Sequence, residues 1–320
     1  MSDPVPALSG DSPASSPPAP APPGDRSLFE SSSRIFVFVR VCLYLILSFG
    51  TGDALQFLAS PLLRQDLPRL SPRVLMIDEL ILFASALLPA LILARLEKRS
   101  IAAYGLPLQH AFGKLFWQGV LLGLLEISAV IGTMAAFGSY HFGALAIQGA
   151  DLLRWAFFWA AFFVVVGFCE EFQFRGYLQF TLSQAIDFWP AAGLLSLAFG
   201  FVHRSNQGEN WVGVAGVILT GMLWCFALRR TGNLWLPIGM HAAFDFGETF
   251  LYSVPDSGYV FPGHLSNSTI AGPAWLTGGT VGPEASLFDF LTLVLFFFVI
   301  HLLYPAKPHL PGLAKAASSP

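Results

Sequence analysis

Two adjacent glutamates, Glu170 and Glu171, stand at the end of a long apolar segment that begins at Trp155. Burying a carboxylate in hydrocarbon costs roughly 3 to more than 10 kcal/mol, so such groups are kept where they are paired or used. On a helix Arg175, four residues after Glu171, would form an ion pair with it. Glu170 would point about 100° away from that face. A carboxylate without such a partner is suited to take a proton from water as a general base.

Later apolar segments contribute two histidines and an aspartate. His203 ends one such segment, and His241 and Asp245 stand four residues apart in another. That spacing puts His241 and Asp245 on one face of a helix. Imidazoles beside a general base could position a water or stabilise an oxyanion, while Asp245 could orient His241 or bind substrate.

The chain that must position these residues is unusually apolar: 54% of its 320 residues are hydrophobic and only 12% are charged. This composition predicts an all-α, polytopic membrane protein surrounded by the lipid bilayer. The net charge of -3 offers no basic surface, so we expect no nucleic-acid partner. Each apolar run approaches the ~20 residues with which a helix crosses a bilayer. We expect a helical bundle of about eight transmembrane helices, over residues 35–57, 74–95, 113–137, 152–182, 189–204, 211–229, 233–252 and 286–304.

Composition also predicts the segments that precede and follow the part of the chain with the polar motifs. Residues 1–33 are rich in Pro, Ala and Ser, which predicts a disordered tail. Residues 34–109 hold the N-terminal transmembrane helices, and residues 286–320 hold the last one with a C-terminal tail. Residues 256–285 form a loop rich in Gly and Pro. It is long enough to fold over the helix ends as a cap, and a loosely ordered surface loop is the alternative.

The polar residues can form one site only if their helices place them at one depth. If the helix that carries Glu170 continues to about residue 183, Glu170 lies roughly 18 Å from the following turn. On that scale His203 lies about 21 Å, His241 about 12 Å and Asp245 about 18 Å from the same side. All four then share one layer of a hydrocarbon slab about 30 Å thick. A helix that stopped at Glu170 would put Glu170 and His203 at opposite surfaces.

The basic residues predict the orientation, because cytoplasmic loops usually hold the excess of Lys and Arg. With the amino terminus inside, the inner side collects twelve of the 17 basic residues and the outer side five. We therefore expect a multi-pass protein with both termini in the cytoplasm. The inner group is Arg26, Arg34, Arg40, Arg95, Lys98, Arg99, Lys114, Arg175, Arg229, Arg230, Lys307 and Lys315, and the outer group is Arg64, Arg69, Arg73, Arg154 and Arg204.

Three motifs resemble those of a known family: Glu-Glu-x-x-x-Arg at 170–175, Phe-x-x-x-His at 199–203 and His-x-x-x-Asp at 241–245. They are similar to the motifs of the CPBP (Abi) family of intramembrane proteases. That family includes the type II CAAX prenyl endopeptidases and bacterial relatives implicated in bacteriocin self-immunity. The resemblance implies a protease core over residues 110–255, a bacterial plasma membrane, and a membrane-anchored protein or peptide as substrate, which is prenylated in the CAAX branch.

The resemblance also assigns roles to single residues. Glu170 would activate the water that attacks a peptide bond, and Glu171 and Arg175 would be its supporting pair. His203 and His241 would be the remaining essential groups. The predicted activity is therefore that of an endopeptidase, a hydrolase.

Asp245 stands where many members of the family have Asn. An amide can donate a hydrogen bond to an oxyanion, whereas an ionised carboxylate cannot. Asp245 is therefore a metal ligand, a protonated acid or an accepted variant. A glutamate mechanism needs no cofactor, but a divalent metal such as zinc, held by His203, His241 and Asp245 with one position open, is the alternative.

Two other functions use the same residues differently. A non-proteolytic immunity or scaffold protein would need the polar layer only to fix helix packing. A transporter would use it as a path for protons or ions. For Glu126 and Glu248, the default interpretation is pairing inside the bundle.

Overall fold

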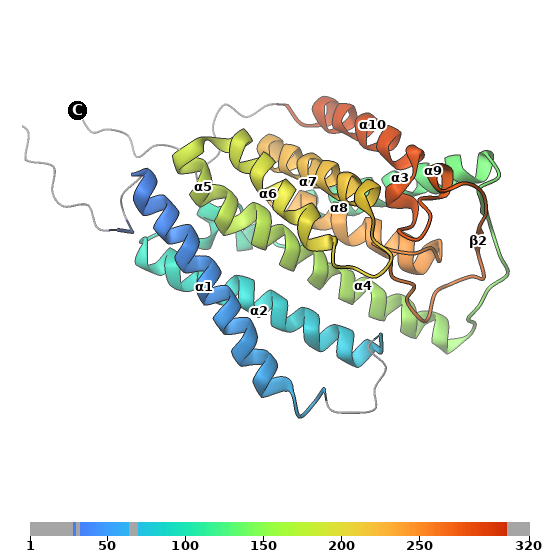
Figure 1. Ribbon diagram of the computed structural model, residues 1–320, viewed down its shortest axis with the longest axis horizontal. Coiled ribbons are helices and arrows are strands. Elements are labelled where there is room, and N and C mark those ends of the chain that lie inside the picture. The colour runs from blue at the N-terminus through green and yellow to red at the C-terminus, as the bar shows by residue number, and fades with distance from the viewer. Residues whose placement is uncertain (1–27, 30–32, 64–69, 306–320) are drawn as a thin grey trace, which may run out of the picture.

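The computed structural model describes residues 28, 29, 33–63 and 70–305 (Figure 1). The predicted tail of residues 1–33 lies almost wholly outside the described residues, as does the predicted C-terminal tail from residue 306. The described chain is an all-α bundle, which confirms the predicted fold class. Its α-helices are α1 (Arg34–Ala59), α2 (Pro72–Leu96), α3 (Lys114–Ala136), α4 (Ala150–Glu171), α5 (Leu178–Ile186), α6 (Phe188–His203), α7 (Trp211–Thr231), α8 (Trp235–Phe246), α9 (Ala274–Thr277) and α10 (Leu287–Leu303).

Shorter elements join these helices. Two of them, η3 and η4, are π-helical and extend α4 and α8. Two short strands pair in antiparallel fashion. The shorter elements are η1 (Ile101–Tyr104), η2 (Leu108–His110), β1 (Tyr140–His141), η3 (Phe172–Tyr177), η4 (Gly247–Leu251), β2 (Thr269–Ile270) and η5 (Pro283–Ala285).

Five helices of the described chain are long and apolar enough to cross a membrane: α1, α2, α3, α7 and the continuous stretch Ala150–Ile186. α6 and α10 are apolar but shorter. Each predicted apolar segment coincides with a helix or a series of helices, apart from a few residues at the ends. Large apolar side chains point outward, as a lipid-facing surface requires: Phe38, Phe57 and Leu302 are 65%, 78% and 80% exposed. The chain is an integral membrane protein.

α8 is the most enclosed part of this bundle, since every residue from Trp235 to Asp245 is buried. It packs against α3, α4 and α7. In Figure 1, α1 and α2 lie side by side along one edge, and the rod formed by α4 and α5 separates them from α6, α7 and α10. The two polar residues of α8 are therefore held from several sides.

Three glycines let α3 and α8 meet at backbone contact. A Cβ atom on Gly119 of α3 would lie 2.2 Å from the Leu236 carbonyl oxygen, and one on Gly123 would lie 2.1 Å from that of Met240. From the other side, a Cβ atom on Gly239 would lie 2.2 Å from the Phe116 carbonyl oxygen. Small residues permit such an approach between helices in a membrane. We call this contact the glycine seam; it fixes the backbone next to His241.

The helix that carries Glu170 does continue past it, through η3 and α5 to Ile186. The continuation is not a regular α-helix. Gly176 inside the π-helical segment has φ -88° and ψ -114°, and the Phe172 ring packs against it. π-helical turns within α-helices are frequent at functional sites.

Residues 252–286, here called the cap, form an ordered connection between η4 and α10. Strand β2 of the cap pairs with β1, which follows α3. The Tyr140 hydroxyl donates to the Tyr252 carbonyl oxygen at 2.9 Å, and the Thr280 hydroxyl donates to the Gly208 carbonyl oxygen at 2.7 Å. The predicted loop of residues 256–285 is thus folded over the helix ends.

Candidate active site

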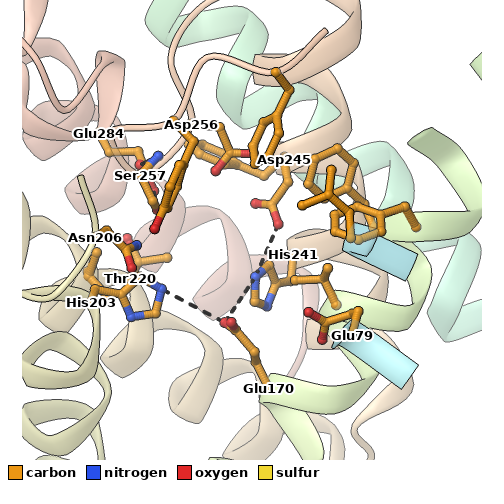
Figure 2. A pocket seen from close by; sticks show the side chains of 18 of the residues that line it. Glu79, Glu170, His203, Asn206, Thr220, His241, Asp245, Asp256, Ser257 and Glu284 are labelled. Carbon is orange, nitrogen blue, oxygen red and sulfur yellow. Dashed lines mark hydrogen bonds and ion pairs between the residues drawn. The ribbon is translucent and has the colours of Figure 1, made fainter. Parts of the chain in front are cut away.

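A cavity of about 610 Å³ lies between α2, α4, α6, α7, α8 and the cap. The predicted residues Glu170, His203, His241 and Asp245 all line it. Figure 2 shows Glu170 reaching toward both histidines, with Asp245 beyond His241 on the side of the cap. Residues from three distant parts of the chain therefore meet in one chamber.

Glu170 is the carboxylate of this group that the cavity reaches best, because its side chain is 27% exposed. Its Oε2 atom lies 3.7 Å from Nε2 of His241 and 4.0 Å from Nε2 of His203. Both distances exceed a direct hydrogen bond and suit a bridge through one water molecule.

Glu171 faces the opposite way, into the protein. Its Oε1 atom pairs with the Arg175 guanidinium at 3.2 Å, and neither side chain is exposed. The same oxygen lies 3.1 Å from Nδ1 of His241. A carboxylate oxygen here can only accept, so the His241 Nδ1–H donates to it. The ion pair expected within one helix thus also orients the imidazole of another.

His241 is held on two further sides. Its Nε2 atom lies 3.3 Å from Asp245 Oδ2, the contact expected from their spacing of four residues. The indole of Trp224 on α7 stacks on the imidazole, with ring centroids 4.0 Å apart and an angle of 21°. Trp224 also lies beside the Arg175 guanidinium, at 5.4 Å from its ring centroid. The sequence did not indicate Trp224, because a Trp in an apolar helix carries no signal of the imidazole on which it stacks.

His203 lies at the last residue of α6. Its Nδ1 atom is 2.9 Å from the Phe199 carbonyl oxygen, which can only accept, so Nδ1 carries the proton. The ring nitrogen that faces Glu170 is therefore the one left with a lone pair when the ring is neutral.

Other polar groups that line the cavity were not predicted. Glu79 reaches it from α2, and Asp256, Ser257 and Glu284 reach it from the cap (Figure 2). The signal for Glu79 was a charge inside an apolar run. The cap residues gave none, because a loop sequence does not reveal what the loop covers. Burial and the neighbouring Asp245 carboxyl raise the pKa of Asp256 above its usual range and that of Glu284 to about 8.

Metal-ligating atoms group differently from the expected set of His203, His241 and Asp245. Among the described residues, the three side chains whose ligand atoms all lie within 4.8 Å of one another are Asp245, Glu248 and Asp256. This group contains Asp245 but neither histidine. A metal on the histidines stays a prediction.

The fold and cavity define a class: an integral membrane protein with a carboxylate and two imidazoles enclosed under a cap. Comparison with known families gives one match, over part of the chain. Residues 152–247 match the family model for the Type II CAAX prenyl endopeptidase Rce1-like proteins, which confirms the resemblance seen in the motifs. Comparisons with curated proteins and with solved structures give no match. This stretch includes all six predicted site residues, and its match supports similarity to the CAAX-type intramembrane proteases at the level of the family.

Proposed function

We propose that the chain is an intramembrane endopeptidase that hydrolyses a peptide bond in a membrane-associated protein or peptide. One observation carries the proposal. The Glu170 Oε2 atom lies within 4.0 Å of Nε2 of both His203 and His241, at the wall of a cavity large enough for a peptide segment.

In this mechanism Glu170 is the general base. A water held between Glu170 and the His203 lone pair gives a proton to Glu170 as its oxygen attacks the carbonyl carbon of the substrate. The C–O bond forms first, and the C–N bond then breaks. Glu170 returns the proton to the leaving nitrogen, so the products are a carboxylate end and an amine end.

His241 is suited to stabilise the oxyanion. Both of its ring nitrogens face carboxylate oxygens, Nδ1 toward Glu171 and Nε2 toward Asp245. Because these oxygens accept hydrogen bonds, the geometry favours an imidazolium with a proton on each nitrogen. The single Nε2–H of the imidazolium would be shared between Asp245 and the developing oxyanion. Asp245 then stabilises the positive charge of the His241 imidazolium. This role needs a carboxylate and not the N–H donor that an Asn side chain would offer.

The metal-dependent alternative uses the same residues. A zinc ion on His203, His241 and Asp245 would supply a water of lowered pKa and polarise the carbonyl. Glu170 would remain the base in either case. Sensitivity to a chelator separates the two mechanisms.

The cavity wall supports an apolar substrate segment. Leu75, Phe162, Phe163 and Phe261 line it together with the polar groups. A prenylated CAAX-type end and an unmodified membrane-anchored peptide both fit this chemistry. A panel of peptides with and without the lipid distinguishes them.

We also propose a bacterial plasma membrane with both termini in the cytoplasm. Two of the inner basic residues, Arg40 and Arg175, are buried in ion pairs and do not count as loop charges. Without them the inner side still holds more basic residues than the outer side. In this orientation the cap lies on the outer side. Substrate entry from within the membrane or from that side then fits better than entry from the cytoplasm.

The test is cleavage of membrane-anchored peptides by purified protein in proteoliposomes, with and without chelator. Glu170→Gln should lower kcat by roughly 100- to 10,000-fold while leaving the melting temperature near that of the wild type. Glu126→Gln is the matched control, because it neutralises a buried carboxylate of α3 outside the cavity. Its kcat should equal that of the wild type.

Full cleavage by Glu170→Gln would reject the proposal. If no peptide is cleaved, and Glu170→Gln lowers the melting temperature but keeps the cellular role, the scaffold or immunity function replaces it. Substrate uptake without cleavage would favour a transporter.

A further inference from the structure

Three acidic side chains converge where α8 meets the cap. Asp245 comes from α8, Glu248 from η4 and Asp256 from the cap, and all three are buried. One oxygen of each lies within 4.8 Å of an oxygen of the others. Glu284 of the cap lines the same end of the cavity (Figure 2). His241 contacts this group at Asp245, and its other ring nitrogen contacts Glu171.

The carboxylate of Glu248 is buried without a hydrogen-bond partner. Its side chain is 0% exposed, and neither carboxylate oxygen has a hydrogen-bond partner among the described residues. Its ligand oxygen nevertheless lies within 4.8 Å of those of Asp245 and Asp256, so it points into the group. A buried carboxylate without a hydrogen bond or counter-charge carries a large desolvation cost.

Neutralisation by protons is the alternative to a bound cation at this group. A protonated carboxyl group would donate a hydrogen bond to a neighbouring acid, yet no hydrogen bond joins the three side chains as the structure describes them. Asp256 instead accepts from the Thr249 hydroxyl at 2.8 Å.

The spacing suits a cation. Ca²⁺ binds carboxylate oxygens at about 2.3 to 2.6 Å, so two ligands on opposite sides lie roughly 4.6 to 5.2 Å apart and adjacent ligands lie closer. An all-oxygen set selects hard cations such as Ca²⁺, Mg²⁺ or Mn²⁺, whereas zinc prefers nitrogen and sulfur.

We propose that Asp245, Glu248 and Asp256 form a binding site for one hard divalent cation, which shares Asp245 with the alternative zinc set but uses neither histidine. The site joins α8 and η4 to the cap, because Asp256 is a cap residue. It also touches the proposed catalytic group through Asp245, which contacts His241 Nε2 at 3.3 Å. The inference goes beyond the proposed function, since the cation secures the cap and takes no part in bond cleavage.

Binding of Mn²⁺ tests the site without any substrate. The full chain, purified in detergent and freed of metal with a chelator, is titrated while free Mn²⁺ is followed by electron paramagnetic resonance. The wild type should bind one Mn²⁺ per chain, and Ca²⁺ should compete. Glu248→Gln and Asp256→Asn should each weaken binding at least about tenfold, because each removes a charged ligand. Glu126→Gln should bind as the wild type does.

Each variant is first compared with the wild type by its melting temperature without metal, so that a folding defect in one leaves the other informative. Absence of Mn²⁺ binding by the wild type would overturn the proposal. Unchanged binding by both Glu248→Gln and Asp256→Asn would do so too, as would binding lost in His203→Ala but kept in Glu248→Gln. Peptide cleavage is not measured here, so failure of the proposed protease function leaves this result intact.

Discussion

The bundle contains two buried Glu–Arg pairs of nearly equal geometry. Arg40 and Glu97 lie 3.3 Å apart, and Arg175 and Glu171 lie 3.2 Å apart, with every side chain 2% exposed or less. Replacing either pair by apolar residues would be close to neutral on general grounds, since desolvation offsets the attraction. The pairs differ in the third residue that each glutamate holds.

Glu97 holds two tyrosines. The hydroxyl groups of Tyr104 and Tyr177 both donate to its carboxylate, far from the cavity. Glu171 instead holds His241, whose other nitrogen faces the cavity. The role of a buried ion pair therefore follows from its third partner. Two neutral hydroxyls make the Glu97 pair a structural contact, whereas the Glu171 pair orients an imidazole that is catalytic in the proposed mechanism.

The largest effect should come from Glu171→Gln. The amide can donate to Nδ1 of His241 as well as accept from it, so the ring loses its fixed protonation and orientation. We expect kcat to fall roughly 1,000-fold in folded protein, as when the carboxylate behind a catalytic histidine is neutralised. Peptide cleavage per folded molecule measures it. A kcat within tenfold of the wild type would remove the distinction between the two pairs.

Glu97→Gln should act on stability instead. It breaks the buried ion pair between Glu97 and Arg40, which should lower the free energy of unfolding by about 3 to 5 kcal/mol. Unfolding in detergent with increasing denaturant measures this loss. The protein that remains folded at low temperature should cleave peptide at the wild-type kcat. Catalytic loss without loss of stability would contradict the comparison.

Tyr104→Phe tests the structural role of the Glu97 pair with a smaller loss of stability. It removes the 2.6 Å hydrogen bond from the Tyr104 hydroxyl to Glu97, a bond to a charged group worth about 1.5 to 3 kcal/mol. The free energy of unfolding should fall by that amount and kcat should not change. Tyr44→Phe is the matched control: it removes a buried hydroxyl that donates to the neutral Ala86 carbonyl oxygen at 3.0 Å, so it should cost only about 0.5 to 1.5 kcal/mol.

The smallest effect is expected from Trp224→Phe on the catalytic side. The stacking on His241 would weaken by about 0.5 to 1.5 kcal/mol. Since about 1.4 kcal/mol corresponds to a factor of ten, kcat should fall by at most about tenfold. Steady-state kinetics at constant pH measure the change. An unaltered rate would show that Glu171 and Asp245 suffice to hold the ring.

What lies along one helix was readable from the sequence. The apolar runs predicted the bundle, and spacings of four residues predicted the contacts of Glu171 with Arg175 and of His241 with Asp245. The π-helical turn at Gly176 was not expected, because no residue pattern distinguishes it from a regular helix. It did not break the continuity on which the depth argument rested.

The sequence indicated less about contacts between different helices. The bond from His241 to Glu171 joins residues 70 positions apart, and the sequence indicated only that both could lie at one depth. Glu248 was assigned to pairing within the bundle, and its approach to Asp256 depends on how the cap folds. Such contacts follow from packing, which composition and spacing do not specify.

The glycine seam has a consequence for access to the cavity. With α3 and α8 in backbone contact, neither can separate from the other without losing that contact along several turns. The helix that bears His241 is therefore the wall of the cavity least free to move. If the cavity opens to a substrate, we expect the movement at the edge formed by α2, which packs against α1 and α4.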